Sequence, residues 1–263
     1  MRDDRLTDEQ RTIALRALAE ESTHRHHLVV HLSGAHAYGF PSPDSDVDIK
    51  ALHVAPTRAL LGFEPPPPTA NRLEILDGIE IDYTSNELSV CVRGLLKGDG
   101  NMLERVFSQA WVGERDPRLD GLAEHAKATL SQRLHRHYHG FARSQFKAVQ
   151  EAERPSAKKA LYVLRTALTG THLLLERACE PDLTRLHERY GFPEVDELVQ
   201  HKQRGETHPL DDDAAKTAAG ALTRAFETLD DALRRSPLPA EPDPKAVAAL
   251  EAWLIATRLA EVD

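Results

Sequence analysis

Two aspartates separated by one valine, Asp46 and Asp48, stand at the start of an apolar run in the segment SGAHAYGFPSPDSDVDIK, residues 33–50. Alternate residues of a β-strand point to the same face, so these carboxylates would lie about 7 Å apart. Two carboxylates at this spacing repel each other unless a cation binds between them, and oxygen ligands suit Mg²⁺ or Mn²⁺. Asp82 falls on the polar side of a later predicted strand. The sequence therefore predicts that Asp46, Asp48 and Asp82 converge on one edge of a sheet as catalytic metal ligands.

A turn of small residues precedes the aspartates, because Ser33, Gly34 and Ala35 follow the β-branched run HLVVHL. A strand that ends in small residues and leads into a helix leaves backbone N–H groups available to a phosphate. Ser45, next to Asp46, would add a hydroxyl donor. The pattern predicts that the turn binds a phosphate tail while the aspartates hold two divalent ions. For the Asp-Val-Asp pattern taken alone, a solvated turn is the alternative interpretation.

The first half of the chain alternates strand and helix signals. The pattern predicts a helix over 7–21, strands over 27–34 and 46–55, and a hairpin around Asp77-Gly78, the dipeptide that favours a tight two-residue turn. Asn86 opens the sequence of a further helix that Gly98 ends. The proline-rich stretch 64–70 cannot pair in a sheet and is expected to be a loop.

After residue 117 only helical periodicity remains. Apolar residues at 122, 126, 130, 134 and 138 predict one long helix, and three more helices follow, the first with Ser156 as its cap. We therefore expect an α+β protein with an N-terminal α/β lobe built on a mixed sheet and a C-terminal all-α lobe. The predicted domains are 1–115 and 116–263.

Composition narrows the class of protein. The 263 residues are 41% hydrophobic and 29% charged, as in ordinary globular chains, and the net charge of −9 argues against a general nucleic-acid coat but not against a local basic groove. The 2 cysteines form no metal-binding pair, the polar N-terminus is no signal peptide, and no apolar stretch could cross a membrane. We expect a cytoplasmic protein.

The whole segment SGAHAYGFPSPDSDVDI resembles the DNA polymerase β-like nucleotidyltransferase superfamily, whose signature is a strand, Gly-Ser, about ten residues and Asp-x-Asp. The bacterial RlaP or YcgL type, associated with RNA repair, is the most similar subgroup. EIDYTSNEL, LLKGDGNMLERVFS and KKALYVLR also match it, so the resemblance covers roughly residues 27–205. The chain departs from the signature at Ala35, where a serine hydroxyl usually contacts the terminal phosphate.

The resemblance implies an enzyme that transfers a nucleoside monophosphate from a metal-bound nucleoside triphosphate to a hydroxyl. Asp46 and Asp48 would hold both ions, and Asp82 would bind the catalytic ion and accept a proton. His36 would contact phosphate. Lys158, Tyr162 and Arg165, one stripe of a helix, would face the nucleotide.

Several other residues have two interpretations. Glu80 is either a further carboxylate of the site or an exposed strand charge. Asn101 and Glu104 either contact the sugar or cap and pack a helix. Four cations of the helical half either bind a polynucleotide or are solvated: Arg133, Arg136, Arg143 and Lys147. Three alternate histidines there cannot all bind one ion and are expected on a wet helix face: His135, His137 and His139.

The acceptor of the transferred nucleotide is the least determined part of this hypothesis. An RNA or other polynucleotide 3′ end is expected from the subgroup. Transfer to a protein side chain, transfer to a small molecule, and a nucleotide-binding module without catalysis are the alternatives, the last because of Ala35.

Overall fold

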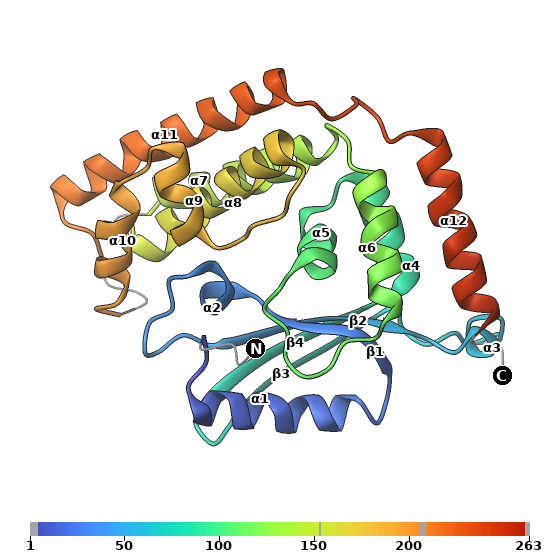
Figure 1. Ribbon diagram of the computed structural model, residues 1–263. Coiled ribbons are helices and arrows are strands. Elements are labelled where there is room, and N and C mark those ends of the chain that lie inside the picture. The colour runs from blue at the N-terminus through green and yellow to red at the C-terminus, as the bar shows by residue number, and fades with distance from the viewer. Residues whose placement is uncertain (1–4, 153, 206–208, 261–263) are drawn as a thin grey trace. The chain divides into compact units, whose positions relative to one another are not determined.

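The computed structural model describes residues 5–152, 154–205 and 209–260, and these form two compact units (Figure 1). The first, here called the sheet unit, comprises residues 1–33, 46–130 and 241–263, and the second, the helical unit, comprises 34–45 and 131–240. The predicted class is confirmed: the strands lie in the N-terminal part and helices make up the rest. The division into domains at residue 115 remains a prediction.

The sheet unit contains all four strands of the described chain. Its elements are α1 (Asp8–Glu21), β1 (His26–Leu32), β2 (Val47–Val54), α3 (Thr57–Leu60), β3 (Thr69–Leu76), β4 (Ile79–Glu87), α4 (Leu88–Lys97), α5 (Gly100–Phe107), α6 (Arg118–Ala128) and α12 (Pro244–Leu259).

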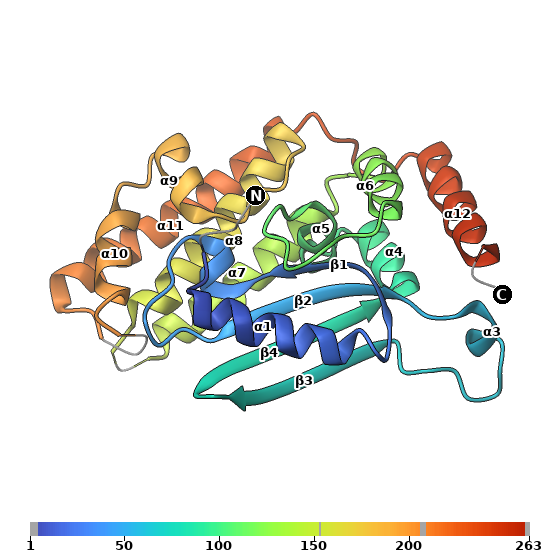
Figure 2. The same ribbon diagram turned by 60° about the horizontal axis from the view of Figure 1, so that its bottom comes forward.

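The strands form a mixed sheet in the order β1-β2-β4-β3 (Figure 2). The β2–β4 pair is parallel, and the two outer pairs are antiparallel. The turn between β3 and β4 has two residues with positive φ, 50° at Asp77 and 87° at Gly78. This is the backbone twist that a two-residue hairpin needs, so the predicted hairpin is confirmed.

Helices cover both faces of the sheet, with α1 on one face and α4, α5 and α6 on the other (Figure 1). The helix predicted over 7–21 is α1, and a capping box formed by Thr7 and Gln10 starts it. Apolar and charged residues alternate along β2: Val47 and Ile49 are fully buried, while Asp48 and Lys50 between them are half-buried. This period of two separates the core side chains from the charged ones.

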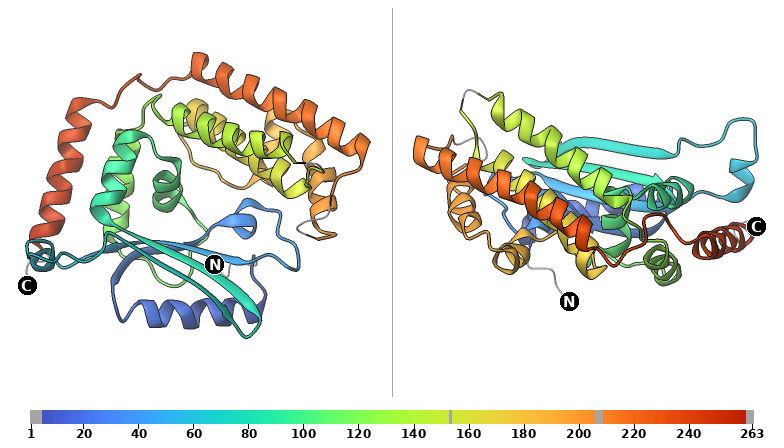
Figure 3. Two further views of the ribbon diagram at one scale, coloured as in Figure 1. Left: turned by 180° about the vertical axis from the view of Figure 1, so that it is seen from behind. Right: turned by 90° about the horizontal axis from the view of Figure 1, so that it is seen from above.

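The last helix, α12, packs beside α6 and α4 (Figure 3). Arg258 near its end makes an ion pair with Glu87, which is 2% exposed, and donates to the carbonyl oxygen of Ala55 at 3.2 Å. Burial acts to raise the pKa of Glu87, but hydrogen bonds from Arg258 and Ser89 outweigh it and hold that pKa below its usual range. The buried carboxylate is therefore ionised and paired.

The helical unit is organised around one helix. Its elements are α2 (Gly34–Tyr38), α7 (Leu134–Gln150), α8 (Ala157–Glu176), α9 (Leu183–Tyr190), α10 (Glu194–Lys202) and α11 (Asp212–Arg235). The central helix is α8, against which α7, α9, α10 and α11 pack. Ser156 caps it as predicted. Gly170 allows the close crossing with α7, because a Cβ there would lie 2.6 Å from Cβ of Tyr138.

The single long helix predicted through residues 122–138 is wrong. The structure has two helices instead, α6 and α7, which belong to different units. The chain leaves α6 where the Thr129 hydroxyl donates to the carbonyl oxygen of Ala126 at 3.0 Å, and Gln132 then donates its backbone N–H to Pro239 at 2.8 Å. Side chain and loop contacts thus replace the helical bonds at this point. The apolar series is buried as its spacing suggests, but in two separate cores.

Among the described residues, no helix is both long and apolar enough to span a bilayer.

Candidate functional site

The carboxylates predicted as metal ligands come together at the middle of the sheet. Asp48 and Asp82 are direct partners in the parallel pair of β2 and β4, so their side chains leave the same face on neighbouring strands. Asp46 lies two residues before Asp48 and acts on its ionisation. Hydrogen bonding of the sheet thus brings Asp82 beside residues more than thirty positions earlier in the chain.

A lysine that the sequence reasoning missed lies between the two paired carboxylates. Nζ of Lys50 is 2.9 Å from Oδ2 of Asp82 and 3.4 Å from Oδ1 of Asp48. The signal was present in the sequence, because Lys50 is two residues after Asp48 and must share its face. The site therefore already attracts a cation, in this case an ammonium group.

Burial raises the pKa of Asp48 to about 6, and the negative charges of Asp46 and Asp82 add to this increase while Lys50 opposes it. Only 16% of the Asp48 side chain is exposed, compared with 40% for Asp82. Near neutral pH a cation bound here would keep Asp48 ionised. The electrostatics of the cluster thus favour added positive charge.

The donor set fits a divalent ion in its chemistry, since three carboxylates supply the oxygen atoms that Mg²⁺ and Mn²⁺ prefer. Over residues 5–152, 154–205 and 209–260, no group of three or more His, Cys, Asp or Glu side chains is arranged to hold a metal ion. The metal role of Asp46, Asp48 and Asp82 remains a prediction.

The predicted phosphate turn is the short helix α2, and it is buried. Gly34 begins it with a φ of 59°, a conformation that favours glycine. Ala35 and His36 are 2% and 4% exposed. Ser33 belongs to the sheet unit, where its backbone N–H donates to the carbonyl oxygen of Asp48 at 2.9 Å. The turn is therefore a firmly packed segment rather than an open loop.

Ser45 takes part in a buried polar cluster that the sequence reasoning did not find. Nζ of Lys202 donates to Oγ of Ser42 at 2.9 Å and to Oγ of Ser45 at 3.1 Å, and the backbone N–H of Ser42 donates to Oγ of Ser45 at 3.0 Å. Lys202 is 1% exposed and comes from α10. The sequence contained a signal, because Lys202 continues the apolar stripe formed by Val195 and Leu198.

The predicted stripe on α8 divides into two parts. Lys158 and Tyr162 line a cavity of about 500 Å³ inside the helical unit, together with Arg154 and Lys159, which the sequence reasoning missed. This cavity, here called the basic cavity, is suited to an anion because three of its side chains are cationic.

Arg165, the third member of the stripe, does not line this cavity. It is 4% exposed, and its guanidinium lies 3.7 Å from the ring centroid of Tyr38 in α2. Tyr162 also packs edge-on against Tyr38, with ring centroids 5.8 Å apart. Arg165 therefore packs against α2, the predicted phosphate turn, whereas Lys158 lines the basic cavity.

The remaining predicted residues take structural positions. Glu80 and Asn101 are exposed, and Glu104 is 7% exposed. Nε2 of His135 lies 2.9 Å from Asp230, and His137 stacks on Phe141, with ring centroids 6.0 Å apart. These histidines are half-buried on α7.

Comparisons with known proteins identify a family and several relatives. Residues 9–256 match the family model described as "RlaP: RNA repair pathway DNA polymerase beta family". The chain is 25% identical over 228 residues to the uncharacterized protein MJ0002 of Methanocaldococcus jannaschii, covering 83% of this chain and 89% of that protein. It is 26% identical over 196 residues to the uncharacterized protein YcgL of Bacillus subtilis, covering 68% and 70%.

A solved structure of a nucleotidyltransferase-like protein from Exiguobacterium sibiricum shares 10% identity, with a TM-score of 0.36, over 96% of this chain and 89% of the other. The family match is the finding that identifies the protein, because it spans nearly the whole sequence and includes both units. It indicates nucleotidyl transfer as the general type of activity. The chain belongs to the RlaP family, the RNA repair pathway DNA polymerase β family.

Proposed function

We propose that the protein transfers a nucleoside monophosphate from a nucleoside triphosphate to the 3′ hydroxyl of an RNA end. One observation carries the proposal: Asp48 and Asp82 are paired across neighbouring strands, with Asp46 beside them and a cation already between them. The family's description as part of an RNA repair pathway supports RNA as the acceptor.

The reaction assigns a task to each carboxylate. The acceptor oxygen would form a bond to the α-phosphorus while the bond to the pyrophosphate breaks, and the acceptor proton would pass to Asp82, the more exposed carboxylate. Asp46 and Asp48 would hold two Mg²⁺ or Mn²⁺ ions. When bound, these ions would neutralise the triphosphate and lower the pKa of the attacking hydroxyl.

The cations of the basic cavity would bind phosphates. Lys158 and its neighbours in the basic cavity, Arg154 and Lys159, would bind the triphosphate as point charges and forked donors. The loop before Asp46 would add Ser45, which the Lys202 ammonium holds in place. Because Ala35 has no hydroxyl, the turn would contact phosphate through backbone N–H groups.

The test is transfer of label from α-³²P nucleoside triphosphates, with Mg²⁺ or Mn²⁺, to a panel of RNA oligonucleotides. We expect a one-nucleotide extension with the natural chain and none with Asp46→Ala, because the cations lose a ligand. Circular dichroism and the melting temperature would verify that the variant is folded.

The same assay separates the other activities. Label on a protein band would show that the acceptor is a protein side chain rather than RNA. Label on a small molecule would show that the acceptor is a small molecule. Tight nucleotide binding without any transfer would show a binding module and would overturn the proposal.

A further inference from the structure

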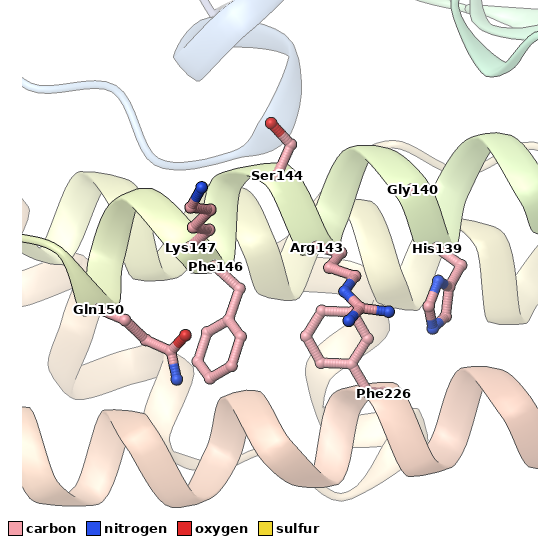
Figure 4. Close-up of a pocket in the computed structure, with 8 residues that line it drawn as sticks. All are labelled: His139, Gly140, Arg143, Ser144, Phe146, Lys147, Gln150 and Phe226. Atoms are coloured by element: carbon pink, nitrogen blue, oxygen red, sulfur yellow. The ribbon is translucent and has the colours of Figure 1, made fainter.

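A second cavity lies between α7 and α11, within the helical unit. It has a volume of about 640 Å³ and is lined by His139, Arg143, Phe146 and Lys147 of α7 and by Phe226 of α11. Figure 4 shows the rings of His139, Phe146 and Phe226 in the space between the two helices. We call this cavity the α7–α11 groove.

The groove combines aromatic rings with cations. Phe226 lies between two other rings: its centroid is 5.6 Å from that of Phe146 and 5.5 Å from that of His139, in tilted and edge-on arrangements. All three rings are only half-buried. Aromatic side chains that accept stacked bases, flanked by cations that contact phosphates, are the usual means of binding single-stranded nucleic acid.

The charge of the groove is opposite to that of the whole chain. No acidic residue lines it, although the protein carries a net charge of −9. Lys147 is 3.5 Å from Glu151, and both of these side chains are largely exposed. Exposed pairs of this kind are weak, so Lys147 can exchange its partner for a phosphate.

The groove and the basic cavity use different faces of the same helix. His139, Arg143, Phe146 and Gln150 follow each other at spacings of three and four residues and form one face of α7, whereas Gln145 and Ala148 of α7 line the basic cavity. One helix of about 10–12 Å diameter thus separates the two cavities.

The path around α7 from one cavity to the other runs over small residues. Gly140 and Ser144 lie between the two faces, and a Cβ added at Gly140 would meet no heavy atom within 4 Å. This side of the helix is therefore open at Gly140, and Lys147 extends from it as a cation that a phosphate could contact.

We propose that the α7–α11 groove binds the single-stranded end of the polynucleotide that accepts the nucleotide. The role of this polynucleotide as the acceptor rests on the proposed function, but its binding to the groove does not depend on catalysis. The bases would stack on Phe146 and Phe226, and Arg143 and Lys147 would contact the phosphates.

The experiment measures binding of a fluorescent single-stranded RNA of about 12 nucleotides, a length within the range that such sites cover. Fluorescence anisotropy would be recorded over a series of salt concentrations without nucleotide or metal. We expect Phe146→Ala with Phe226→Ala to weaken binding at least ~10-fold through lost stacking. Arg143→Glu, on an exposed side chain, should weaken binding and reduce the salt dependence by about one phosphate contact.

Two matched controls lie outside the groove. Phe141→Ala removes an aromatic ring that is 42% exposed on the same helix, and Lys216→Glu reverses a charge on α11. Both should bind RNA like the natural chain. Because the two-phenylalanine variant loses packing between the helices, Arg143→Glu is the variant that keeps the test valid if the former does not fold.

Equal affinity of Arg143→Glu and the natural chain would overturn the inference, as would equal competition by a blunt RNA duplex, whose bases cannot stack on the rings. If Arg143→Glu lowers RNA binding while the natural chain transfers no nucleotide, the groove stands and the proposed function fails. If nucleotide transfer is lost in Asp46→Ala but RNA affinity is unchanged in Arg143→Glu, the proposed function is supported and only the inference about the groove is wrong.

Discussion

The sheet unit gathers acidic groups at its candidate site, whereas the helical unit gathers basic ones. In the sheet unit, Asp46, Asp48 and Asp82 are brought together by the period of two along β2 and by the register with β4. In the helical unit, Lys158 and Arg143 lie on helix faces built from spacings of three and four residues. A strand pair places two charges side by side, which suits a metal ion, and a helix spreads charges along a line, which suits a phosphate chain.

Removing one acidic charge is the most direct test of the contrast between the acidic site of the sheet unit and the basic helical unit. Asp48→Asn keeps the shape of the side chain but removes its negative charge and replaces one carboxylate oxygen by an NH2 group, so we expect transfer to fall at least ~100-fold, the effect of losing a group that acts in the transition state. The measurement is the initial rate of RNA extension at saturating nucleotide.

Glu80→Gln is the matched control, since Glu80 is exposed on β4 two residues before Asp82. It should extend RNA at nearly the natural rate. If both variants lose the same activity, the response reflects net charge rather than the paired site.

Acid should weaken the sheet unit through its histidines. Burial lowers the pKa of His31 and of His27 to about 4, and it lowers that of His53 as well. A histidine with a depressed pKa binds its proton more readily in the unfolded chain, so stability is complete above the unfolded pKa near 6.5 and is lost as the pH falls toward 4. For His31 alone the loss between pH 7 and pH 5 is about 2 kcal/mol, from 1.36 kcal/mol per pKa unit.

Urea unfolding at pH 7 and pH 5 tests this contribution. His31→Leu should reduce the loss of free energy of unfolding on acidification, whereas the exposed His24→Gln should not. Hydrogen exchange, corrected for intrinsic rates, should show β1 and β2 opening more than α8 at pH 5. Equal acid losses in the natural chain and His31→Leu would contradict the expectation.

A basic group buried in the helical unit gives an effect of similar size on stability. Lys202→Met removes the donor shared by Ser42 and Ser45, and hydrogen bonds from a charged group contribute roughly 1.5–3 kcal/mol. We expect the free energy of unfolding to fall by about that amount and nucleotide affinity to fall as well, since the loop before Asp46 loses its support.

Lys202→Arg offers the comparison within the same site, because it keeps the charge but cannot place one ammonium between both hydroxyls. It should retain less nucleotide affinity than the natural chain. A Lys202→Met variant with unchanged nucleotide affinity would show that the cluster serves stability alone.

Lys158→Ala should have the smallest effect on stability, within about 0.5 kcal/mol, as for surface substitutions in general. Nucleotide affinity should fall several-fold, because one of three cations of the basic cavity is lost. Isothermal titration with a nonhydrolysable nucleoside triphosphate measures this change. The exposed Lys216→Ala on α11 is the control, and equal affinities of the two variants would contradict a triphosphate in the cavity.

Local sequence patterns were enough to predict most helices and strands, but not the contacts between elements that are distant in the chain. The first helix, the Asp77-Gly78 turn and the end of α4 at Gly98 follow from short patterns, and the structure confirms them. The break between α6 and α7 could not be predicted, because it depends on Pro239, more than one hundred residues later.

The same limit applies to the candidate site. The shared face of Asp46 and Asp48 follows from strand alternation, and the polar side of its own strand assigned Asp82 to the same site. The register that pairs Asp48 with Asp82 is seen only in the structure. Lys50 and Lys202 were recognisable in principle, one by strand parity and the other by its place on an apolar stripe. Arg165 was assigned to the nucleotide because spacing alone does not distinguish a side chain beneath the turn from one in a cavity.

The ion pair of Glu87 with Arg258 has a consequence for the order in which the protein is made. These partners are 171 positions apart, so the carboxylate at the end of β4 emerges during translation long before its guanidinium is synthesised. At about 5–20 residues per second, the delay is roughly 10–30 s. Until then the Glu87 carboxylate has donors only from its own part of the chain, such as the backbone N–H and the hydroxyl of Ser89. The sheet unit therefore gains its full set of contacts at Glu87 only after α12 has been made.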